Sequence, residues 1–301
     1  MSEAPRSYNV ITPVRNDEQN LRAVAAALMD QTVRPTRWII ADNGSTDSTR
    51  AEAQKIASSI DWVTAVEVPT DAHTTRGAAI VRAFHAGLAE VCTEADVIVK
   101  LDADITFGVD HYERLIGAFA ADSSLGIVSG VCFEQATDGT WRQRHGSGFG
   151  VWGANRAYRR ACLAAILPLE ERMGWDTIDL VKASLRGWTT QVLEDVPFRH
   201  HRPEGSRESR RTRAWALQGQ AAYFMGYRPS YLLLRTIYRT VQEPSAAALL
   251  WGYLSAVMRR EQRCADSYVR GYLRSTQRWR YLLDRARKAR RPRTVLGSST
   301  K

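Results

Sequence analysis

Short apolar runs alternate with amphipathic stretches along the first hundred residues of the chain. Four of these runs have the length and the β-branched residues of buried strands, at residues 8–12, 37–41, 62–68 and 96–102. After the first run, apolar side chains recur with helical spacing at Leu21, Val24, Ala25 and Leu28. Because strands and helices alternate, we predict an α/β fold around a mainly parallel central sheet.

The alternation is less regular in the rest of the chain. Residues 125–133 are a further predicted strand, and residues 156–190 are predicted to be largely helical. From residue 202 an arginine-rich stretch precedes more helical segments. No period of about 20 to 50 residues repeats, which excludes a solenoid. We therefore predict one domain over residues 1–225 and a basic helical region over residues 226–301.

Charge divides the chain into two unequal parts. The net charge is +10, yet residues 1–201 hold 20 Lys and Arg against 26 Asp and Glu, a net of −6. The remaining residues hold 22 against 6, a net of +16. This asymmetry favours an anionic partner for the last third, either an acidic membrane surface or a nucleic acid. Nucleic acid is the weaker alternative because no nucleic-acid-binding motif accompanies the charge. A solvated arginine-rich helical face is the third interpretation.

Residues 244–258 form a stretch of fifteen residues without charge. A membrane-spanning helix needs about 20 apolar residues, so this stretch is too short to cross a bilayer. With Trp251 and Tyr253 inside it and arginines on both sides, it suits a helix that lies in a membrane interface. The alternative is a core helix that packs against the first domain.

The cysteines and the N-terminus indicate the compartment. The four cysteines lie far apart and without a zinc-like spacing, at Cys92, Cys132, Cys162 and Cys264. They are predicted to be reduced thiols of a cytosolic protein. The first ten residues have neither a basic leader nor a long apolar run, so no signal peptide is expected. The predicted location is cytoplasmic, with peripheral attachment to the inner face of the cell membrane as a further hypothesis.

Polar residues follow three of the predicted strands, at the edge where parallel α/β sheets bind ligands. Asp102 and Asp104 come directly after the fourth strand, in the segment VIVKLDADITF (residues 97–107). Side chains two residues apart in a strand point the same way, which would bring both carboxylates to one spot. Their repulsion favours a hard divalent ion between them, Mg²⁺ or Mn²⁺. A polar turn that ends the strand is the alternative.

Five segments in order match those of one enzyme family. They are TPVRNDEQNL (12–21), WIIADNGSTDST (38–49), RGAAIVRAFHAG (76–87), VKLDAD (99–104) and GWDTIDLVKASLRGW (174–188). Over about residues 8–225 the chain resembles the family-2 glycosyltransferases, which are inverting, nucleotide-sugar-dependent enzymes. The resemblance implies their Rossmann-like A-type glycosyltransferase fold and a metal-dependent glycosyl transfer.

The resemblance also implies a donor site. The positions that match donor-binding residues are Thr12, Pro13, Val14, Arg15, Asp42, Asn43, Arg76, Arg82, Asp102 and Ala103. Asp42 matches the acid that accepts a hydrogen bond from the base, usually uracil, which implies a UDP-linked sugar. Asp102 is expected beside the ribose and in the metal shell, and Asp104 as the direct ligand of Mg²⁺ or Mn²⁺. Such an ion stabilises the charge of a departing diphosphate.

A catalytic base is implied on the acceptor side, where the family has an acidic pair. The matching positions are Ile178 and Asp179, so one acid is replaced and Asp179 is the predicted base. Asp176 is the second candidate. Either carboxylate has to lie within hydrogen-bond reach of the acceptor hydroxyl. The alternative is that both are solvated carboxylates in the first turn of a helix.

Two histidines and a basic loop complete the predicted site. In related enzymes a late histidine completes the metal shell, and alternation along the strand allows only one of His200 and His201 to do so. We favour His201, with two loop histidines as the alternative. Arg207 lies in an arginine-rich loop that is expected to close over the diphosphate of the bound nucleotide.

The sequence therefore predicts an inverting glycosyltransferase whose acceptor is a saccharide, lipid-linked as in the assembly of a surface polysaccharide or glycolipid. A nucleotidyltransferase that makes a nucleotide sugar is one alternative, although no early glycine-rich triphosphate loop is present. A non-catalytic protein that binds anions or nucleic acid is the other, and only the basic last third favours it.

Overall fold

A sheet of ten strands forms the body of the part of the chain that the structure describes. A computed structural model describes residues 6–69, 77–91, 95–136, 138–144, 150–202, 211–277 and 295–296. The strands are β1 (Tyr8–Val14), β2 (Arg37–Asp42), β3 (Val63–Glu67), β4 (Val97–Leu101), β5 (Ile105–Phe107), β6 (Leu125–Gln135), β7 (Trp141–Gln143), β8 (Asn155–Arg159), β9 (Thr189–His200) and β10 (Val295–Leu296). Their order in space is β10-β7-β6-β8-β4-β1-β2-β3, and β9 pairs with both β5 and β6.

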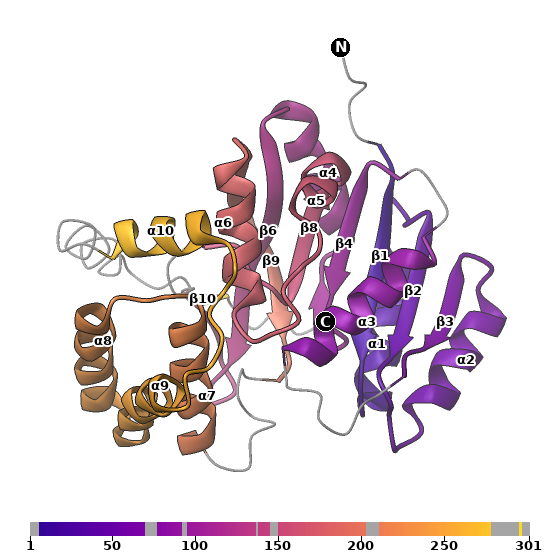
Figure 1. Cartoon of the computed structure of the whole chain (residues 1–301). Coiled ribbons are helices and arrows are strands. Elements are labelled where there is room, and N and C mark those ends of the chain that lie inside the picture. Colours follow the sequence, from indigo (N-terminus) through magenta and orange to yellow (C-terminus); the bar gives the residue numbers. More distant parts are fainter. Residues whose placement is uncertain are drawn as a thin grey trace.

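The four strands that the early apolar runs predict lie side by side (Figure 1). β4, β1, β2 and β3 are neighbours in this order and run parallel. Their carboxyl ends therefore meet at one edge, where β1 ends at Val14, β2 at Asp42 and β4 at Leu101. Beyond β4 the sheet is mixed, because β8 is antiparallel to β4 and β6 whereas β9 is parallel to β6. The predicted α/β fold is confirmed.

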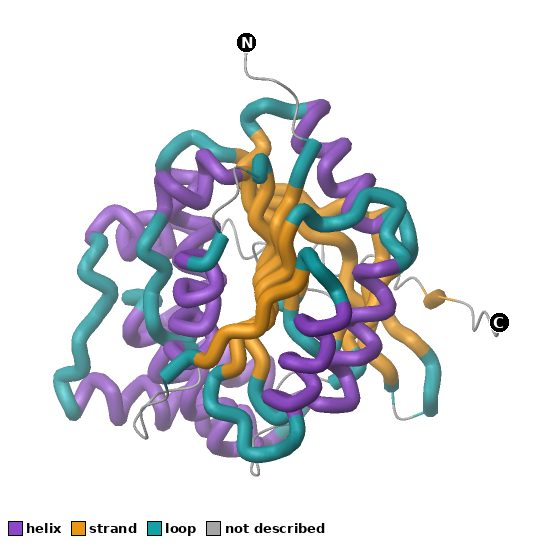
Figure 2. Tube along the Cα trace, turned by 90° about the vertical axis from the view of Figure 1, so that its right-hand side faces the viewer, coloured by secondary structure: helices purple, strands orange, loops and turns teal. Residues whose placement is uncertain are grey.

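Helices cover both faces of the sheet (Figure 2). They are α1 (Glu18–Met29), α2 (Thr49–Ser59), α3 (Ala78–Ala89), α4 (His111–Ala121), α5 (Arg160–Ile166), α6 (Trp175–Leu185), α7 (Arg211–Phe224), α8 (Pro229–Gln242), the 3₁₀ helix η1 (Pro244–Ala247), α9 (Ala248–Met258) and α10 (Ser267–Thr276). The core under α1, α2 and α4 takes Val10 and Val99 from the strands. The core under α3, α5 and α6 takes Ile11 and Ile98, because successive strand residues face opposite sides.

The helices after residue 211 pack on one another beside the sheet (Figure 1). α7 and α9 approach closely because each has a glycine where the other's backbone passes. A Cβ on Gly219 would lie 2.0 Å from the carbonyl oxygen of Leu249, and one on Gly252 would lie 1.9 Å from that of Ala216. The domain boundary at residue 225 stays a prediction.

α8 turns its apolar side chains outward. Its exposed large hydrophobic residues, 37% to 84% accessible, are Leu233, Leu234, Ile237, Tyr238 and Val241. The only residues that α8 buries are Leu232 and Thr236. An amphipathic helix of a globular protein normally buries its apolar stripe. The outward stripe of α8 is therefore a candidate contact surface.

The uncharged stretch at residues 244–258 forms η1 and α9 and has two different faces. Leu249 and Tyr253 are buried in a core that α9 shares with α7 and α8. Trp251 and Met258 are 64% and 66% exposed. One face thus packs as a core helix, as one of the two interpretations predicts. Among the described residues, no helix combines the length and the apolar character that crossing a membrane requires.

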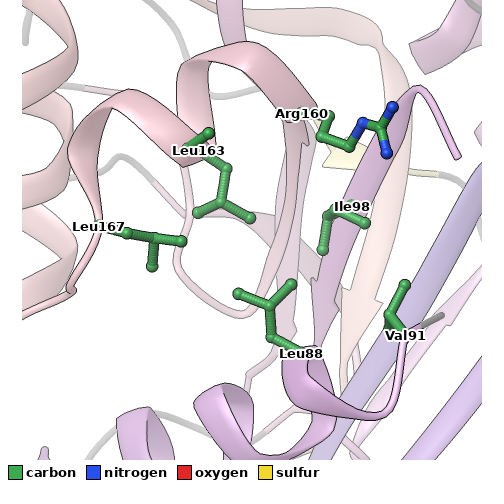
Figure 3. Close-up of a pocket in the computed structure, with 7 residues that line it drawn as sticks. Leu88, Val91, Ile98, Arg160, Leu163 and Leu167 are labelled. Carbon is green, nitrogen blue, oxygen red and sulfur yellow. The ribbon is translucent and has the colours of Figure 1, made fainter. Parts of the chain in front are cut away.

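A cavity of about 120 Å³ lies between α3, β4 and α5 (Figure 3). Its walls are aliphatic and include Leu88, Ile98 and Leu163. None of the residues that are predicted to bind the donor or a metal lines it. The cavity is therefore separate from the predicted donor and metal sites.

The described cysteines are buried free thiols, at Cys132, Cys162 and Cys264. Their reduced state stays a prediction. Cys92 lies outside the described residues.

Candidate active site

The two acids of the LDAD segment lie in the turn between β4 and β5. β4 ends at Leu101 and β5 begins at Ile105, so residues 102–104 are not part of a strand. The expectation that alternation in a strand points both carboxylates the same way is therefore wrong. Each carboxylate instead takes its own partners, although the two still interact, because the charge of Asp104 contributes to raising the pKa of Asp102.

Asp102 is held by a buried lysine. The ammonium of Lys100 donates hydrogen bonds to Oδ1 of Asp102 and, at 2.9 Å, to the carbonyl oxygen of Gly153. The backbone N–H of Asp102 donates to the carbonyl oxygen of Ala154 at 2.7 Å. Burial raises the pKa of Asp102, and the charge of Lys100 opposes this rise. These contacts connect the LDAD turn to the segment that precedes β8.

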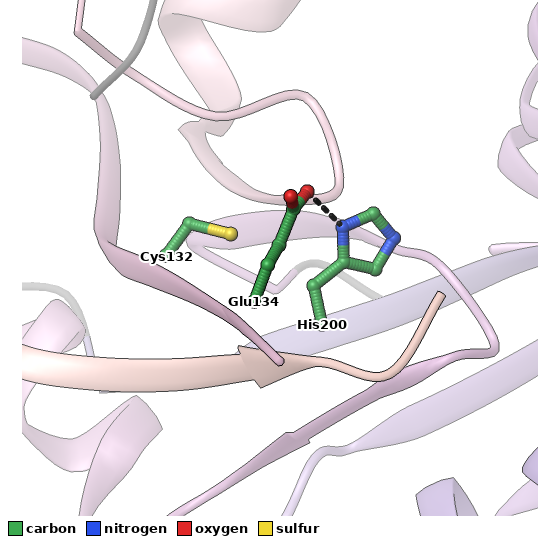
Figure 4. A group of neighbouring side chains, drawn as sticks. All are labelled: Cys132, Glu134 and His200. Atoms are coloured by element: carbon green, nitrogen blue, oxygen red, sulfur yellow. Dashed lines mark ion pairs between the residues drawn. The ribbon is translucent and has the colours of Figure 1, made fainter. Parts of the chain in front are cut away.

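Asp104 is buried beside His200, the last residue of β9. Nε2 of His200 lies 3.3 Å from Oδ1 of Asp104, and Nδ1 lies 3.4 Å from Oε1 of Glu134. Burial alone would lower the pKa of His200, but its contacts with Asp104, Cys132 and Glu134 raise it to about 12. Figure 4 shows the ring of His200 with Glu134 and Cys132 on one side. His200 is thus the histidine that lies closest to the acids.

The side chain of His201 contacts other residues than that of His200. Its Nε2 forms a hydrogen bond of 2.7 Å with the hydroxyl of Thr106, and its ring packs edge-on against Trp141. His201 was the favoured metal ligand, yet the structure brings the neighbouring His200 to Asp104 instead. Alternation along β9 brings one of the two histidines to the acids, and sequence alone does not reveal its phase.

The ends of β1 and β2 form the other wall of the site. Thr12 is buried, and its hydroxyl accepts a hydrogen bond of 2.9 Å from Nε1 of Trp38. Asn16 has a φ of 53° and accepts a bond of 2.8 Å from the N–H of Thr46. Asp42 is 3% exposed and accepts hydrogen bonds from the N–H and the hydroxyl of Ser45. The two loops are thereby joined.

The remaining donor-site positions on these loops and on the LDAD turn are found at the same edge of the sheet. Val14 pairs with Asp42 in the β1–β2 register, and the N–H of Asn43 donates to the carbonyl oxygen of Val14 at 2.9 Å. Pro13 is partly buried, Arg15 is exposed and Ala103 is buried.

Asp179 lies in a closed network inside the protein. Both of its carboxylate oxygens accept hydrogen bonds of 2.7 Å from Nη1 of Arg156, and Oδ2 also accepts one of 2.6 Å from the hydroxyl of Tyr158. Its side chain is 1% exposed. Burial raises the pKa of Asp179, and its contacts with Arg156 and Tyr158 oppose the rise. An acceptor hydroxyl has no access to this carboxylate, so the geometry argues against its predicted role as the base.

Asp176 lies in the first turn of α6 and is only partly buried. A Cβ on Gly153 would be 3.5 Å from Oδ2 of Asp176, so the carboxylate packs directly on the Gly153 backbone. Gly153 is also the residue whose carbonyl oxygen binds Lys100. Asp176 therefore faces the segment that holds Asp102, whereas Asp179, three residues later, faces Arg156.

Gly77 directly precedes α3, and Arg82 lies within this helix. A Cβ on Gly77 would lie 2.2 Å from the backbone nitrogen of Met173, which explains why a glycine is needed against the loop before α6. Nε of Arg82 donates to Oε2 of Glu171 in the same loop at 2.7 Å. Arg76 and Arg207, both predicted to bind the donor, lie outside the described residues.

Arg202 is a candidate site residue in addition to those that the sequence predicts. Its guanidinium forms an ion pair with Asp17, and Nε lies 4.0 Å from Oδ2 of Asp104. It thus places a positive charge between the β1–α1 loop and the LDAD turn. Its position directly after two histidines, in the run HHR, is the signal that would have identified it.

Comparison with known proteins identifies the family of the chain. The profile of glycosyl transferase family 2 matches residues 9–177. Over 146 residues the chain is 30% identical to the succinoglycan biosynthesis protein ExoA of Rhizobium meliloti, which covers 46% of this chain and 42% of ExoA. The chain therefore matches less than half of the length of that relative.

Solved structures share the fold. The mannosyltransferase PcManGT of Pyrobaculum calidifontis, in complex with GDP-Man and Mn²⁺, superposes with a TM-score of 0.56 at 18% identity, over 95% of this chain and 87% of PcManGT. GalNAc-T7, in complex with UDP, GalNAc and Mn²⁺, gives 0.55 at 13% identity, over 75% of this chain and 49% of GalNAc-T7. The A-type glycosyltransferase fold is thus confirmed, and, since the family profile covers more than half of its residues, the chain belongs to glycosyl transferase family 2.

Proposed function

We propose that this glycosyltransferase is an inverting, metal-dependent enzyme that moves a sugar from a nucleotide sugar, UDP-linked, to an acceptor hydroxyl. One observation carries the proposal. Asp104 lies beside His200, and Asp176 on α6 packs against Gly153, whose carbonyl oxygen accepts a hydrogen bond from Lys100, the partner of Asp102. A buried ligand pair for an ion and a more accessible carboxylate are the two groups that such a transfer requires.

The residues present fit a divalent ion. Ligand atoms of one Mg²⁺ or Mn²⁺ lie about 3 Å apart in octahedral geometry, and the Asp104 oxygen and the His200 nitrogen are 3.3 Å apart. A carboxylate oxygen suits Mg²⁺ or Mn²⁺, and a neutral imidazole is a common ligand of divalent transition metals. We propose that Asp104 and His200 would hold the ion directly and that Asp102 would complete its shell. Bound there, the ion would supply positive charge to the diphosphate of the donor.

Asp176 is the proposed catalytic base, in place of Asp179. The acceptor hydroxyl gives its proton to the Asp176 carboxylate while its oxygen attacks the anomeric carbon of the donor sugar. In the same displacement the bond between this carbon and the diphosphate oxygen breaks, and the configuration is inverted. The guanidinium of Arg202 stabilises the negative charge of the departing diphosphate.

Asp179 has a positioning role in this proposal. Nη1 of Arg156 binds both the carboxylate of Asp179 and, at 2.9 Å, the backbone carbonyl oxygen of Asp176. Because Arg156 belongs to β8, the ion pair fixes the first turn of α6 against the sheet. The orientation of the Asp176 side chain depends on this attachment.

The nucleotide base is proposed to lie over the loops after β1 and β2. The hydrogen bonds between Asn16 and Thr46 hold these loops together, and Asp42 is the last residue of β2, directly before the second loop. Nε of Arg50 is 3.4 Å from Oδ2 of Asp42, which leaves that oxygen room for a second donor such as the N3–H of uracil.

A lipid-linked saccharide is the proposed acceptor, with the protein peripheral on the inner face of the cell membrane. The supporting observations are the outward apolar stripe of α8 and the exposed Trp251 of α9. α8 carries Arg235 and Arg239 and no acid, which suits an anionic lipid surface. The name of ExoA, a protein of succinoglycan biosynthesis, supports a role in the assembly of a surface polysaccharide.

The test is incubation with a panel of common nucleotide sugars and Mn²⁺, with and without EDTA. The expected result is metal-dependent release of a nucleoside diphosphate from one donor, together with a product of inverted anomeric configuration by NMR. Release of pyrophosphate from a nucleoside triphosphate would identify a nucleotidyltransferase instead. Binding of donor without any release in the presence of saccharide acceptors would contradict transfer.

A further inference from the structure

We propose that Glu134 is a positioning residue that orients His200 toward the metal. The inference rests on the proposed metal site at Asp104 and His200 and adds a residue that neither the sequence motifs nor the resemblance to the family identifies. The two nitrogens of His200 have different acidic neighbours: Nε2 is 3.3 Å from Asp104 and Nδ1 is 3.4 Å from Glu134. The ring of His200 thus lies between Asp104 of the proposed metal site and the carboxylate of Glu134.

The sheet register places Glu134 behind the histidine. β6 and β9 are parallel, and Glu134 is the direct partner of His200 in their ladder. On its other side His200 is the ladder partner of Ile105, the residue that follows Asp104. Glu134 on β6 and Asp104, the residue directly before β5, therefore approach the ring from the two sides of β9. Figure 4 shows the Glu134 carboxylate directed at Nδ1 of the ring.

Glu134 is itself anchored. Its side chain is 15% exposed, and Oε2 accepts a hydrogen bond from Nη1 of Arg144. The guanidinium of Arg144 lies 5.9 Å from the ring of Trp152. A buried carboxylate with one oxygen on an arginine and the other on a histidine has little freedom to turn. The anchor therefore keeps Oε1 facing Nδ1.

This arrangement determines which nitrogen carries the proton when a metal is bound. A carboxylate at Nδ1 accepts the Nδ1–H hydrogen bond, so the lone pair lies on Nε2, which faces Asp104. The same contact fixes the plane of the ring and increases the basicity of the nitrogen that would bind the ion. Glu134 would therefore act on metal affinity without touching the metal or the donor.

Cys132 suggests an alternative role for Glu134 and His200, as ligands of an ion that Cys132 shares. Ligand atoms of Cys132, Glu134 and His200 all lie within 4.8 Å of one another, a spacing that could hold an ion. The anchoring of Glu134 by Arg144 and the position of Asp104 on the far side of the ring favour the positioning role. A separate ion on Cys132 is treated as an outcome of the test.

The test measures Mn²⁺ affinity by EPR of the full chain. We expect Glu134→Ala to weaken binding by roughly 10- to 100-fold, the effect typical of a lost outer-shell carboxylate. Glu134→Gln, which keeps an acceptor oxygen, should restore part of that loss. In the Mg²⁺-loaded wild type, ¹⁵N NMR should show His200 protonated at Nδ1, and Glu134→Ala should lose this preference.

Glu52→Gln is the matched control, because Glu52 is 11% exposed and paired with Arg22, which takes no part in the proposed metal site. It should leave Mn²⁺ affinity unchanged, and thermal unfolding confirms that each variant is folded. If Asp104→Ala and His200→Ala lose Mn²⁺ while both Glu134 variants bind as wild type, the inference is overturned and the proposed function stands. If Asp104→Ala still binds an ion and Cys132→Ser removes it, Glu134 is a ligand of a separate site and the inference is also overturned. Wild type that binds no Mn²⁺ would contradict the metal site itself.

Discussion

Two parts of the molecule differ in where they place charged and apolar side chains: the part that forms the sheet, and the helices from residue 211 onward. In the first part, charged side chains are drawn inside and paired, as with Lys100 and Asp102 or Arg156 and Asp179. In the second part, large apolar side chains remain outside, as on α8. Buried paired charges hold reacting groups in fixed positions, whereas exposed apolar stripes are suited to contact with another surface.

Charge follows the same division. The first 201 residues carry a net of −6 and the remaining residues a net of +16. An acidic site gains affinity for a cation, and a basic helical layer gains affinity for anionic surfaces. The comparison therefore predicts that changes in the first part alter chemistry or stability, and that changes on the surface of α8 alter attachment.

The largest effect should come from Asp176→Asn. Removal of a general base typically lowers the rate by about 10²- to 10⁴-fold, and the amide keeps the size of the side chain. Donor affinity, measured by calorimetry, should remain within about threefold, since Asp176 is not placed at the nucleotide. A variant with wild-type turnover in single-turnover assays would show that the base lies elsewhere.

Asp179→Asn should destabilise the fold. The substitution leaves Arg156 buried without a countercharge, a change that costs roughly 3–5 kcal/mol in buried pairs. Urea unfolding measures the loss. Tyr158→Phe removes only one neutral donor to the same carboxylate and should cost about 1 kcal/mol. Stability equal to wild type for Asp179→Asn, with turnover abolished, would return Asp179 to the role of base.

Gly252→Val tests whether the helical layer depends on close packing. Its Cβ would overlap the carbonyl oxygen of Ala216, so α7 and α9 must separate. Overpacking of this kind costs typically about 1–3 kcal/mol. Gly117→Ala on α4, where an added Cβ meets nothing within 4 Å, is the control and should be neutral or slightly stabilising. Equal thermal stability of the two variants would mean that the α7–α9 contact is looser than described.

Val241→Ser should have the smallest effect on stability and a visible effect on attachment. Val241 is 84% exposed, so the free energy of unfolding should change by less than about 0.5 kcal/mol. Flotation with vesicles that contain phosphatidylglycerol should weaken, and the double variant Ile237→Ser/Val241→Ser should weaken it further. Met29→Ser on α1, 47% exposed and away from α8, is the control. If flotation is unchanged and a concentration-dependent dimer is lost instead, the stripe binds a second copy.

Much of the fold could be predicted because its signals are local. The apolar runs at β1, β2, β3 and β4 and the helical spacing of Leu21 to Leu28 depend only on neighbouring residues. The orientation of side chains at the site could not be predicted in the same way. β4 ends one residue before Asp102, so the alternation that was assumed for the two acids does not apply.

The choice between paired candidates depended on partners distant in the sequence. Arg156 on β8 binds Asp179 inside the protein. Asp176, three residues earlier, instead faces the segment that holds Asp102. Glu134 and Asp104 select His200, while Thr106 and Trp141 contact His201. The outward orientation of the apolar stripe of α8 could not be predicted either. Its apolar residues have the spacing of a helix that buries this face.

The rate of nucleoside diphosphate release by Asp104→Ala tests the central claim most directly. Wild type should release it only with Mn²⁺ or Mg²⁺, and the variant should be slower by about a thousandfold, or roughly 4 kcal/mol, at saturating donor. Asp110→Ala, an acid at the start of α4 that contacts none of the site residues described above, should match the wild type. Full activity of Asp104→Ala, or equal activity of the wild type in EDTA, would contradict metal-dependent transfer at this end of β4.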